Sequence, residues 1–334
     1  MKTTITDIAR DTGLSLATIS KYLNHRPVLP ENQKLIEESI RRLNYTPNRI
    51  AQSLRSRRTS TIAILIPPLE DCLWGNFIYP LESFLRQNGY TSIICTSSPE
   101  PEKVKPLALF LLNNQIDGAV AIGGTLNQEA LALFRKRRIP VVCIDDTPEP
   151  ASTDLVSSDN YRSAYLAGSY FVRHNHTRIA FLAGQRASYT TVQRTTGFLD
   201  ALRAAGISPR PEYHSYGDST SASAQRQFRE LMALPEPPTA LFFCSYTSFL
   251  GGFMEIMSQN IRIPEDLSVI SFENDAIFDT LTPRMTVISQ DFAAIGQEAA
   301  ALLLKRLSED EEGTPEMRLV KTTFLEGDSV RMLA

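Results

Sequence analysis

Residues 4–24 read Thr4-Ile-Thr-Asp-Ile-Ala-Arg-Asp-Thr-Gly-Leu-Ser-Leu-Ala-Thr-Ile-Ser-Lys-Tyr-Leu-Asn24, which predicts two short helices around a tight turn. Apolar residues recur at helical spacing from Ile5 to Thr12, so one face of the first helix should be buried. Thr4 can cap this helix, with Asp7 at the position where a capping box has its acid. Gly13 can end it, because glycine tolerates left-handed backbone angles.

The second predicted helix has one buried face and one polar face. Ser15 can cap it, and its inward residues are Ile19, Tyr22 and Leu23. Its outward residues are Leu16, Ala17, Ser20 and Lys21. A small helix pair of this kind fits the helix-turn-helix, whose second helix enters the major groove of DNA. An ordinary helical hairpin is the alternative that these residues leave open.

The charge is distributed unevenly along the chain. The 334 residues carry a net charge of −3, but residues 1–60 hold eleven Lys/Arg against five Asp/Glu, and the remainder holds 23 against 32. A chain of this length indicates two or three domains. A basic N-terminal part on an acidic body suits a nucleic-acid-binding module joined to something else. A solvated basic face is the alternative reading of the charge alone.

Three blocks of the N-terminal sequence resemble the LacI/GalR family of bacterial transcription regulators. They are Thr-Ile-Thr-Asp-Ile-Ala at 4–9, Ser-Leu-Ala-Thr-Ile-Ser-Lys-Tyr-Leu-Asn at 15–24 and Leu-Asn-Tyr-Thr-Pro-Asn-Arg-Ile-Ala-Gln-Ser-Leu at 43–54, in the family's order and spacing. The resemblance continues through the whole chain. It implies a homodimeric repressor that binds pseudo-palindromic double-stranded operator DNA and responds to a small-molecule effector.

The resemblance also implies which residues contact DNA. Leu16, Ala17 and Lys21 match the family's three main base-reading positions. The full implied set is Thr4, Ser15, Leu16, Ala17, Thr18, Ser20, Lys21, Asn24, Tyr45, Asn48, Ala51, Leu54 and Arg55.

A third helix is predicted from Pro30 to Leu43, with proline at the favoured first position and Ile36 and Ile40 on the buried face. Leu29 takes the capping position, where the family usually has Ser or Thr, so the start of this helix should be frayed.

Asn48 can cap a further short helix within residues 47–59. Taken alone, this is a plain linker helix, since isolated helices of this length are marginal in water. By resemblance it is the family's hinge helix, which folds when two copies pair over operator DNA. Leu54 matches the leucine that the family inserts into the minor groove, where apolar wedges kink the duplex.

From Thr61 onward, apolar strands alternate with helices, which predicts parallel α/β sheets. The first series has expected strands at 62–66, 91–95, 118–122 and 141–144 and helices at 79–88 and 106–113. The second has strands at 178–182, 239–244 and 267–272 and helices at 161–174, 195–205 and 250–260. A helix at 293–307 and a strand at 322–325 follow.

Two Rossmann-like halves with a cleft between them match the periplasmic-binding-protein fold that the family uses as its sensor. The expected fold is therefore an all-α helix-turn-helix head joined to a two-subdomain α/β sensor. The resemblance implies a DNA-binding domain at 1–46, a hinge helix and linker at 47–59, one sensor subdomain at 60–158 plus 289–320, and the other at 159–288 plus 321–334.

The residues capable of chemistry do not form an enzyme motif. The sequence contains neither GxGxxG, GxxxxGK[S/T] nor GxSxG. The four cysteines lack metal-ligand spacing, and His174 and His176 indicate a solvated turn rather than a metal site. We therefore expect no enzymatic activity, cofactor or metal. No run approaches the roughly 18 apolar residues of a membrane span and no signal peptide is recognisable, so a cytoplasmic protein is expected.

Ligands of α/β folds bind at the carboxyl ends of strands, which places the effector candidates in the cleft. Arg194 belongs to Gln193-Arg-Thr-Thr-Gly-Phe198, which resembles the family's effector-binding Arg-x-x-Gly-Phe/Trp motif. An interdomain salt bridge is its alternative role, and core packing is the alternative for Trp74. The full candidate set is Trp74, Asp145, Arg194, Tyr246, Glu273, Gln290 and Phe292.

Two departures from the family concern the effector. Ser245 and Tyr246 follow a strand after which the family usually has Ala-Asn-Asp, and Ser271-Phe-Glu-Asn274 replaces Gly-Phe/Tyr-Asp-Asp. Without the usual carboxylate, Arg194 should be unbalanced and Tyr246 should add a stacking surface. We therefore expect an anionic, aromatic or otherwise planar effector, for example a sugar acid or a phosphorylated sugar. The alternative is that a nearby carboxylate, Asp145, Glu273 or Asp275, takes over the lost role. A regulator with a vestigial cleft, one that senses a protein partner, and a pure ligand-binding protein remain alternatives.

Overall fold

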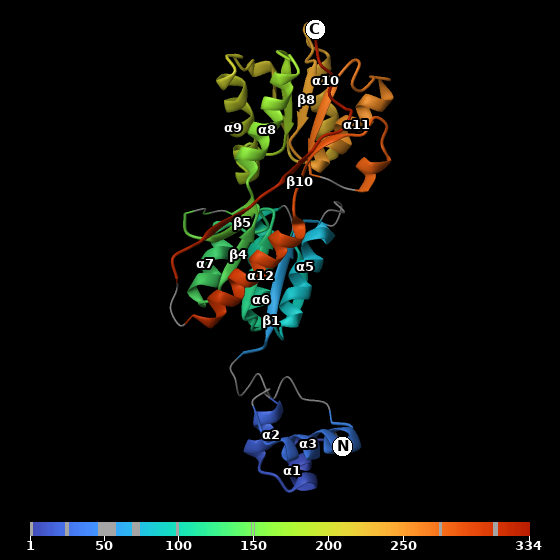
Figure 1. Ribbon diagram of the computed structural model, residues 1–334. Coiled ribbons are helices and arrows are strands. Elements are labelled where there is room, and N and C mark those ends of the chain that lie inside the picture. The colour runs from blue at the N-terminus through green and yellow to red at the C-terminus, as the bar shows by residue number, and fades with distance from the viewer. Residues whose placement is uncertain are drawn as a thin grey trace. The chain divides into compact units, whose positions relative to one another are not determined.

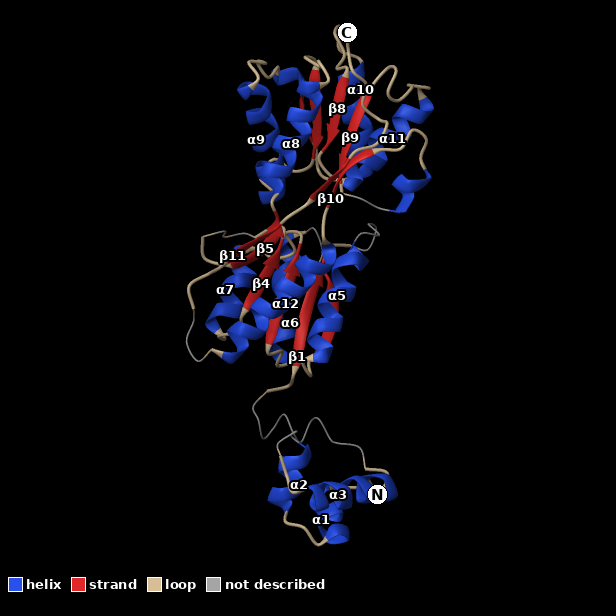
Figure 2. Ribbon diagram, viewed as in Figure 1, coloured by secondary structure: helices blue, strands red, loops and turns tan. Residues whose placement is uncertain are grey.

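The computed structural model describes residues 3–23, 27–45, 58–68, 74–97, 100–147, 149, 151–273, 276–309 and 313–334. These residues form two compact units, one within 1–59 and one within 60–334. Figures 1 and 2 show the first unit as helices only and the second as two sheets with helices around them.

In the first unit, the described residues form a cluster of α1 (Ile5–Thr12), α2 (Leu16–Leu23) and α3 (Pro30–Arg42). Each helix contributes one fully buried isoleucine to the core, namely Ile8, Ile19 and Ile36.

The local signals at the helix ends act as predicted. The Thr4 backbone N–H donates to the Asp7 carboxylate at 2.9 Å, and Gly13 ends α1 with φ +70°. The Ser15 hydroxyl accepts from the Thr18 backbone N–H at 3.1 Å. The predicted pair of capped helices is therefore confirmed.

Leu29 leaves the start of α3 without a capping side chain. It is 61% exposed and makes no capping hydrogen bond. Leu29→Thr should stabilise α3 by about 1 kcal/mol, because a threonine oxygen can accept a bond from an unpaired first-turn N–H. Hydrogen exchange of the Ile36 amide in the full-length protein should then slow about fivefold. Leu29→Ala should leave the exchange rate unchanged, and faster exchange in Leu29→Thr would contradict the expectation.

The first sheet of the second unit is wholly parallel. Its order is β11 (Met317–Val320), β5 (Asp154–Ser158), β4 (Val141–Ile144), β3 (Gly118–Ile122), β1 (Thr61–Ile66) and β2 (Thr91–Thr96). Helices α5 (Trp74–Gln87) and α12 (Phe292–Ser308) bury one face, and α6 (Pro101–Asn113) and α7 (Gln128–Lys136) bury the other.

The second sheet has the same plan. Its order is β12 (Thr323–Leu325), β10 (Thr286–Ser289), β9 (Ser268–Phe272), β8 (Ala240–Phe243), β6 (Ile179–Ala183) and β7 (His214–Tyr216), and β12 alone among these is antiparallel to its neighbour. Helices α8 (Asn160–Arg173) and α9 (Tyr189–Ala204) cover one face, and α10 (Ser221–Met232) and α11 (Tyr246–Ser258) cover the other. Two short 3-10 helices, Pro211–Tyr213 and Ala276–Thr280, lie in its connections.

The chain passes between the two sheets at three places, after Ser158, Ser289 and Val320. The Ser158 hydroxyl donates to Gln290 Oε1 at 2.6 Å, so two of these crossings are tied together. The result is the expected helical head and two-sheet α/β sensor fold. The crossings lie beside the carboxyl ends of β5 and β10, where the site residues gather.

The sequence predicted that His176 lies in a solvated turn, and the structure shows that it is buried. It is 1% exposed, with Nδ1 2.9 Å from Thr239 Oγ1 and Nε2 3.1 Å from the Arg331 carbonyl oxygen. Burial lowers the pKa of His176 to about 4. The C-terminal residues cover it, and the Leu333 N–H donates to the His174 carbonyl at 3.0 Å. A tail that packs back across the sheet is not visible in local sequence.

Candidate functional site

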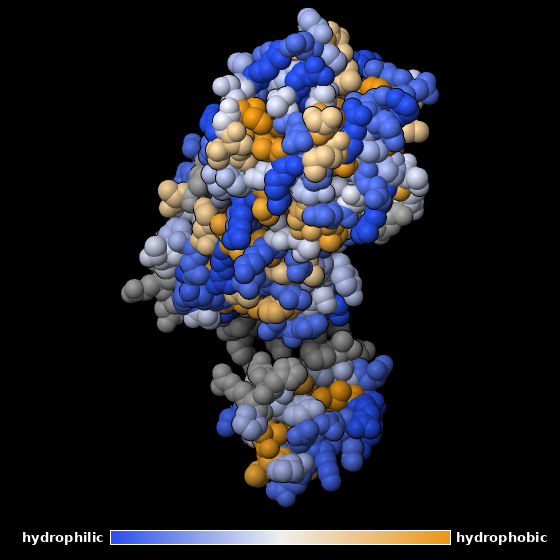
Figure 3. All heavy atoms as spheres, turned by 45° about the horizontal axis from the view of Figure 1, so that its top comes forward, coloured by the Kyte–Doolittle hydropathy of each residue, from blue (hydrophilic) through white to orange (hydrophobic). Residues whose placement is uncertain are grey.

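Helix α2 presents an exposed face opposite its buried one. Leu16, Ala17 and Lys21 are exposed, whereas Ser20 and Thr18 are half-buried. Leu16 and Ser20, like Ala17 and Lys21, are four residues apart and therefore lie next to each other on the helix surface. Figure 3 shows hydrophobic side chains reaching the surface of this first unit among hydrophilic ones.

The other predicted DNA contacts either pack against the core or lie outside the described residues. Tyr45 packs half-buried against the three-isoleucine core, and burial raises its pKa. The predicted contacts in the turn after α2 and in the hinge lie outside the described residues; they are Asn24, Asn48, Ala51, Leu54 and Arg55.

In the sensor, a chain of buried polar side chains joins the two halves. The Ser157 hydroxyl donates to Asp145 Oδ1 at 2.9 Å, and Asn160 Nδ2 donates to the Ser157 hydroxyl at 2.9 Å. Arg194 Nε donates to Asn160 Oδ1 at 2.7 Å. Ser157 belongs to β5 of the first sheet and Arg194 to α9 of the second half. Asp145 and Arg194, far apart in sequence, thus share one network.

Arg194 is held from several sides. It is 4% exposed, and its Nη1 donates to the Cys244 carbonyl at 2.6 Å. Its guanidinium carbon lies 3.6 Å from the centre of the Phe272 ring, a cation–π arrangement. The same Nη1 lies 3.5 Å from Glu273 Oε1. Burial fixes the planar fork in one orientation, which suits hydrogen bonds to a ligand of defined shape.

Glu273 overturns the expectation of an unbalanced arginine. Its carboxylate accepts a bond from the Tyr246 backbone N–H at 3.1 Å and forms the ion pair with Arg194. Glu273 adopts a left-handed φ of +77°, which is uncommon for a residue other than glycine. Of the carboxylates that the sequence offered as replacements, Glu273 is the one that pairs with Arg194.

Tyr246 does not offer the stacking surface expected from the sequence. It is 5% exposed and belongs to the core beneath α10 and α11, with its ring centre 6.2 Å from that of Phe278. Helix α11 begins at Tyr246, capped by Ser245, rather than at 250 as expected. The first turn of the helix therefore turns this ring into the core.

The sequence analysis named Asp145 as a candidate and left out its neighbour Asp146, and the two carboxylates differ in position. Burial raises the pKa of Asp145, although Arg194 and Ser157 oppose the shift. Asp146 accepts a bond from the Tyr189 backbone N–H at 3.2 Å, at the start of α9, and burial raises its pKa as well. Asp146 therefore links the loop after β4 to the second half of the sensor.

The aromatic candidates lie on the first half. Trp74 is half-buried at the start of α5, 6.2 Å between ring centres from Phe77, which lies edge-on to Phe292 at 4.6 Å. A side chain at Gly123 would come within 3.0 Å of the Trp74 ring, and Gly123 has φ +61°. Glycine is required at this turn on both grounds, and Trp74 is partly used in packing.

Gln290 was predicted at the site and lies at the crossing. It is 6% exposed, its Oε1 accepts from Ser158, and its Nε2 has no partner among the described residues. Ser157, Ser158 and Asn160 were missed by the sequence analysis. Their signal is a run of small polar residues, Ser157-Ser158-Asp159-Asn160, at the carboxyl end of a strand that the sequence did not reveal.

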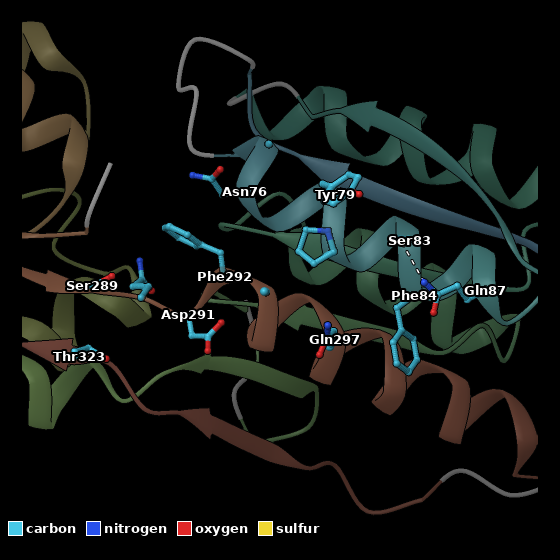
Figure 4. A pocket seen from close by; sticks show the side chains of 14 residues that line it. Asn76, Tyr79, Ser83, Phe84, Gln87, Ser289, Asp291, Phe292, Gln297 and Thr323 are labelled. Carbon is cyan, nitrogen blue, oxygen red and sulfur yellow. Dashed lines mark hydrogen bonds between the residues drawn. The ribbon is translucent and has the colours of Figure 1, made fainter. Parts of the chain in front are cut away.

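A groove of about 840 Å³ lies between α5 and α12. Its lining includes Asn76, Tyr79, Phe84, Gln290, Phe292 and Gln297. Figure 4 shows Tyr79 and Phe84 projecting from α5 and Phe292 and Gln297 from α12 on its walls. The groove shares Gln290 and Phe292 with the predicted effector residues, but most of its lining comes from the outer sides of the two helices.

The described part of the chain contains no group of His, Cys, Asp and Glu side chains that could hold a metal ion. None of its described helices is both long and apolar enough to cross a membrane.

Two family models match the chain. "Bacterial regulatory proteins, lacI family" covers residues 4–48, and "Periplasmic binding protein-like domain" covers residues 169–330. The HTH-type transcriptional repressor PurR of Aliivibrio fischeri (strain ATCC 700601 / ES114) is 31% identical over 310 residues, 92% of this chain and 92% of its own length. This chain belongs to the LacI/GalR family of bacterial transcription regulators. The PurR repressor of Pasteurella multocida (strain Pm70) is 29% identical over 92% of this chain and 93% of its own.

Solved structures of the LacI type share the fold. The lac repressor dimer bound to operator and the anti-inducer ONPF gives a TM-score of 0.83 at 21% identity, covering 99% of this chain and 100% of its own. The complex of the regulator CelR with cellobiose gives a TM-score of 0.74 at 24% identity. The match covers 98% of this chain and 100% of the CelR chain. The protein is a LacI-type DNA-binding transcription regulator with an effector-binding sensor.

Proposed function

We propose that this LacI-type regulator represses transcription by placing α2 in the major groove of a pseudo-palindromic operator. The observation that carries the proposal is the two-sided character of α2. Ile19 is fully buried, whereas Ala17 and Lys21 are exposed on the opposite side and Leu16 is exposed at the edge of the buried face. The repressors that the chain resembles support it. The activity requires no enzymatic step, and it belongs in the cytoplasm, where operator DNA is found.

The remaining DNA contacts are proposed from the family resemblance. Around α2 they are Thr4, Ser15, Thr18, Ser20, Asn24 and Tyr45, and in the hinge they are Asn48, Ala51, Leu54 and Arg55. Leu54 would wedge into the central base step, and a flexible pyrimidine–purine step should be favoured there because it costs less to kink.

Lys21 tests the assignment of α2. Its ammonium can contact guanine but lacks the bidentate fork of arginine. Lys21→Ala should weaken binding by about 1–3 kcal/mol for each guanine that Lys21 reads, and it should relax the preference at one base pair of each half-site. Fluorescence anisotropy at fixed salt, against operators with single base-pair changes, measures both effects. Lys34→Ala removes the same charge from an exposed position of α3 and is the control. If Lys21→Ala weakens binding to all operator sequences equally, Lys21 contacts only phosphate.

We further propose that the cleft takes a neutral, hydroxyl-bearing effector such as a sugar. Arg194 is already paired with Glu273, and Asp145 lies in the same network. An anionic ligand would add negative charge beside these carboxylates, whereas hydroxyl groups can both accept from the guanidinium and donate to a carboxylate. The cellobiose bound by the structurally similar CelR fits this class. Trp74 and Phe292 offer ring surface for a sugar face.

We propose that the functional unit is a homodimer. Large apolar side chains are exposed on α5, on the edge strand β2 and on α11; they are Tyr79 (74%), Ile94 (48%), Met254 (60%) and Met257 (63%). In Figure 1, α5 and α11 lie on the same side of the sensor. Side chains of a second copy would enter the groove between α5 and α12. The lac repressor, which shares this fold, was solved as a dimer.

A further inference from the structure

The exposed apolar residues of α2 are unusual for a helix that reads DNA through polar groups. Leu16 is 48% exposed, and the adjacent Ala17 is also exposed. Neither belongs to the hydrophobic core, to which α2 contributes Ile19 together with the half-buried Tyr22 and Leu23. Leu16 begins the helix directly after the cap at Ser15, so its position is well fixed.

The floor of the major groove offers an apolar side chain only one matching group. Each base pair presents hydrogen-bond donors and acceptors there, and thymine alone adds a methyl group at C5. An apolar side chain placed over a guanine or cytosine edge removes water from polar atoms without replacing its hydrogen bonds, which is unfavourable. Against a thymine methyl, the same side chain buries apolar surface, which is favourable.

The spacing on the helix separates this apolar surface from the basic one. Ser20 and Lys21 lie one turn after Leu16 and Ala17, and so on the same face. Four residues of helix rise about 6 Å, so the two pairs of side chains reach different places along the groove. Leu16 and Ala17 should therefore meet a different base pair from the one that Lys21 reads.

We propose that Leu16 and Ala17 select a thymine in each operator half-site by packing against its C5 methyl group. The proposal rests on the proposed operator binding by α2 and adds the chemistry of one position. Reversing that A·T pair moves the methyl group to the other strand, so its orientation is read as well.

The test removes the methyl group without changing the hydrogen-bonding pattern. The full-length protein first selects its preferred operator from random duplex DNA. Deoxyuridine then replaces each selected thymine, symmetrically in the two half-sites. At one position, affinity should fall about fourfold per methyl group removed, and thus about fifteenfold for the two together.

Variants assign the effect to the residues. In Leu16→Ala with Ala17→Gly, the ratio of affinities for thymine and deoxyuridine operators should approach one, whereas Lys21→Ala should retain the wild-type ratio. Equal affinity of the wild type for all deoxyuridine operators would overturn the proposal while leaving operator binding intact. A ratio unchanged in the double variant would overturn the assignment to Leu16 and Ala17. If the protein selects no preferred operator from random DNA, the proposed function as a sequence-specific DNA-binding repressor is wrong.

Discussion

Replacing Arg194 with methionine should lower the free energy of unfolding of the sensor by about 3–5 kcal/mol, the usual cost of removing one partner of a buried charged pair. Asn160 Oδ1 and the Cys244 carbonyl would each be left without this donor, and Glu273 would be left without its ion pair. Methionine keeps similar volume, so the loss reports on polar contacts rather than on a cavity. Urea unfolding of the full-length protein, followed by circular dichroism, measures the change.

Arg203 provides a matched control within α9. Its guanidinium is exposed and paired with Asp200 at 2.7 Å, so Arg203→Met should cost about 0–1 kcal/mol, as surface pairs do. Equal urea midpoints for the Arg194→Met and Arg203→Met proteins would show that the buried network contributes little.

The same variant tests the class of effector. Wild-type protein should bind a neutral sugar, with cellobiose and ribose as the first probes, more tightly than cellobionic acid or ribose 5-phosphate. Arg194→Met should abolish this binding, because the fixed donor fork is gone. Glu273→Gln removes one negative charge while keeping the side-chain shape, so it should narrow the difference between the neutral and anionic probes. Calorimetric titration measures the affinity of each protein for each neutral and anionic probe. If the wild type binds the anionic probes more tightly, the proposal of a neutral effector is wrong.

Placing aspartate at Tyr79 and Met254 together should convert the dimer to a monomer. Both side chains are largely exposed in the single chain and would be buried against the partner, where two unpaired charges per chain are costly. Operator affinity should fall on the order of 100-fold or more, since two linked half-site contacts gain that much over one. Sedimentation velocity measures the mass of the protein, and fluorescence anisotropy on the same preparation measures its affinity for the operator.

A control carries the same charge change on the other side of the sensor. Leu166 on α8 is 40% exposed, and Leu319 on β11 is 50% exposed at the edge of the first sheet opposite β2. Aspartate at these two positions should leave mass and operator affinity unchanged. A monomer from this control, with a dimer retained in the Tyr79 and Met254 variant, would move the interface to the α8 side.

The helices of the first unit could be predicted because their signals are local. Thr4 and Asp7 bond within one turn, and Gly13 supplies the left-handed residue that ends α1. In the sensor, strands made of continuous apolar runs, such as 62–66 and 118–122, were also predicted. Helix starts were less accurate: α5 begins at Trp74 rather than 79, and α6 at Pro101 rather than 106. Pro106 was taken as a helix start, but it lies inside α6.

Strands with polar or alternating residues were not predicted. β5 (Asp154–Ser158) carries three polar residues, all buried, and β11 (Met317–Val320) alternates exposed and half-buried residues. The two strands pair with each other across more than 150 residues, so nothing near either one specifies the pairing. Helices α7 and α10 were also missed, although both have side-chain N-caps at Asn127 and Thr220.

The sequence by itself determined the family, the two-part plan and the outward face of α2, because caps, helical spacing and motif order are carried by neighbouring residues. Only the tertiary structure decided how the sensor site is assembled. Arg194 meets Glu273 across 79 positions of sequence, and the left-handed backbone at Asp145 and Glu273 aims their carboxylates. Tyr246 is buried because the hydrophobic core beneath α11 takes its ring. These outcomes depend on which distant surfaces pack together, and no local pattern encodes that choice.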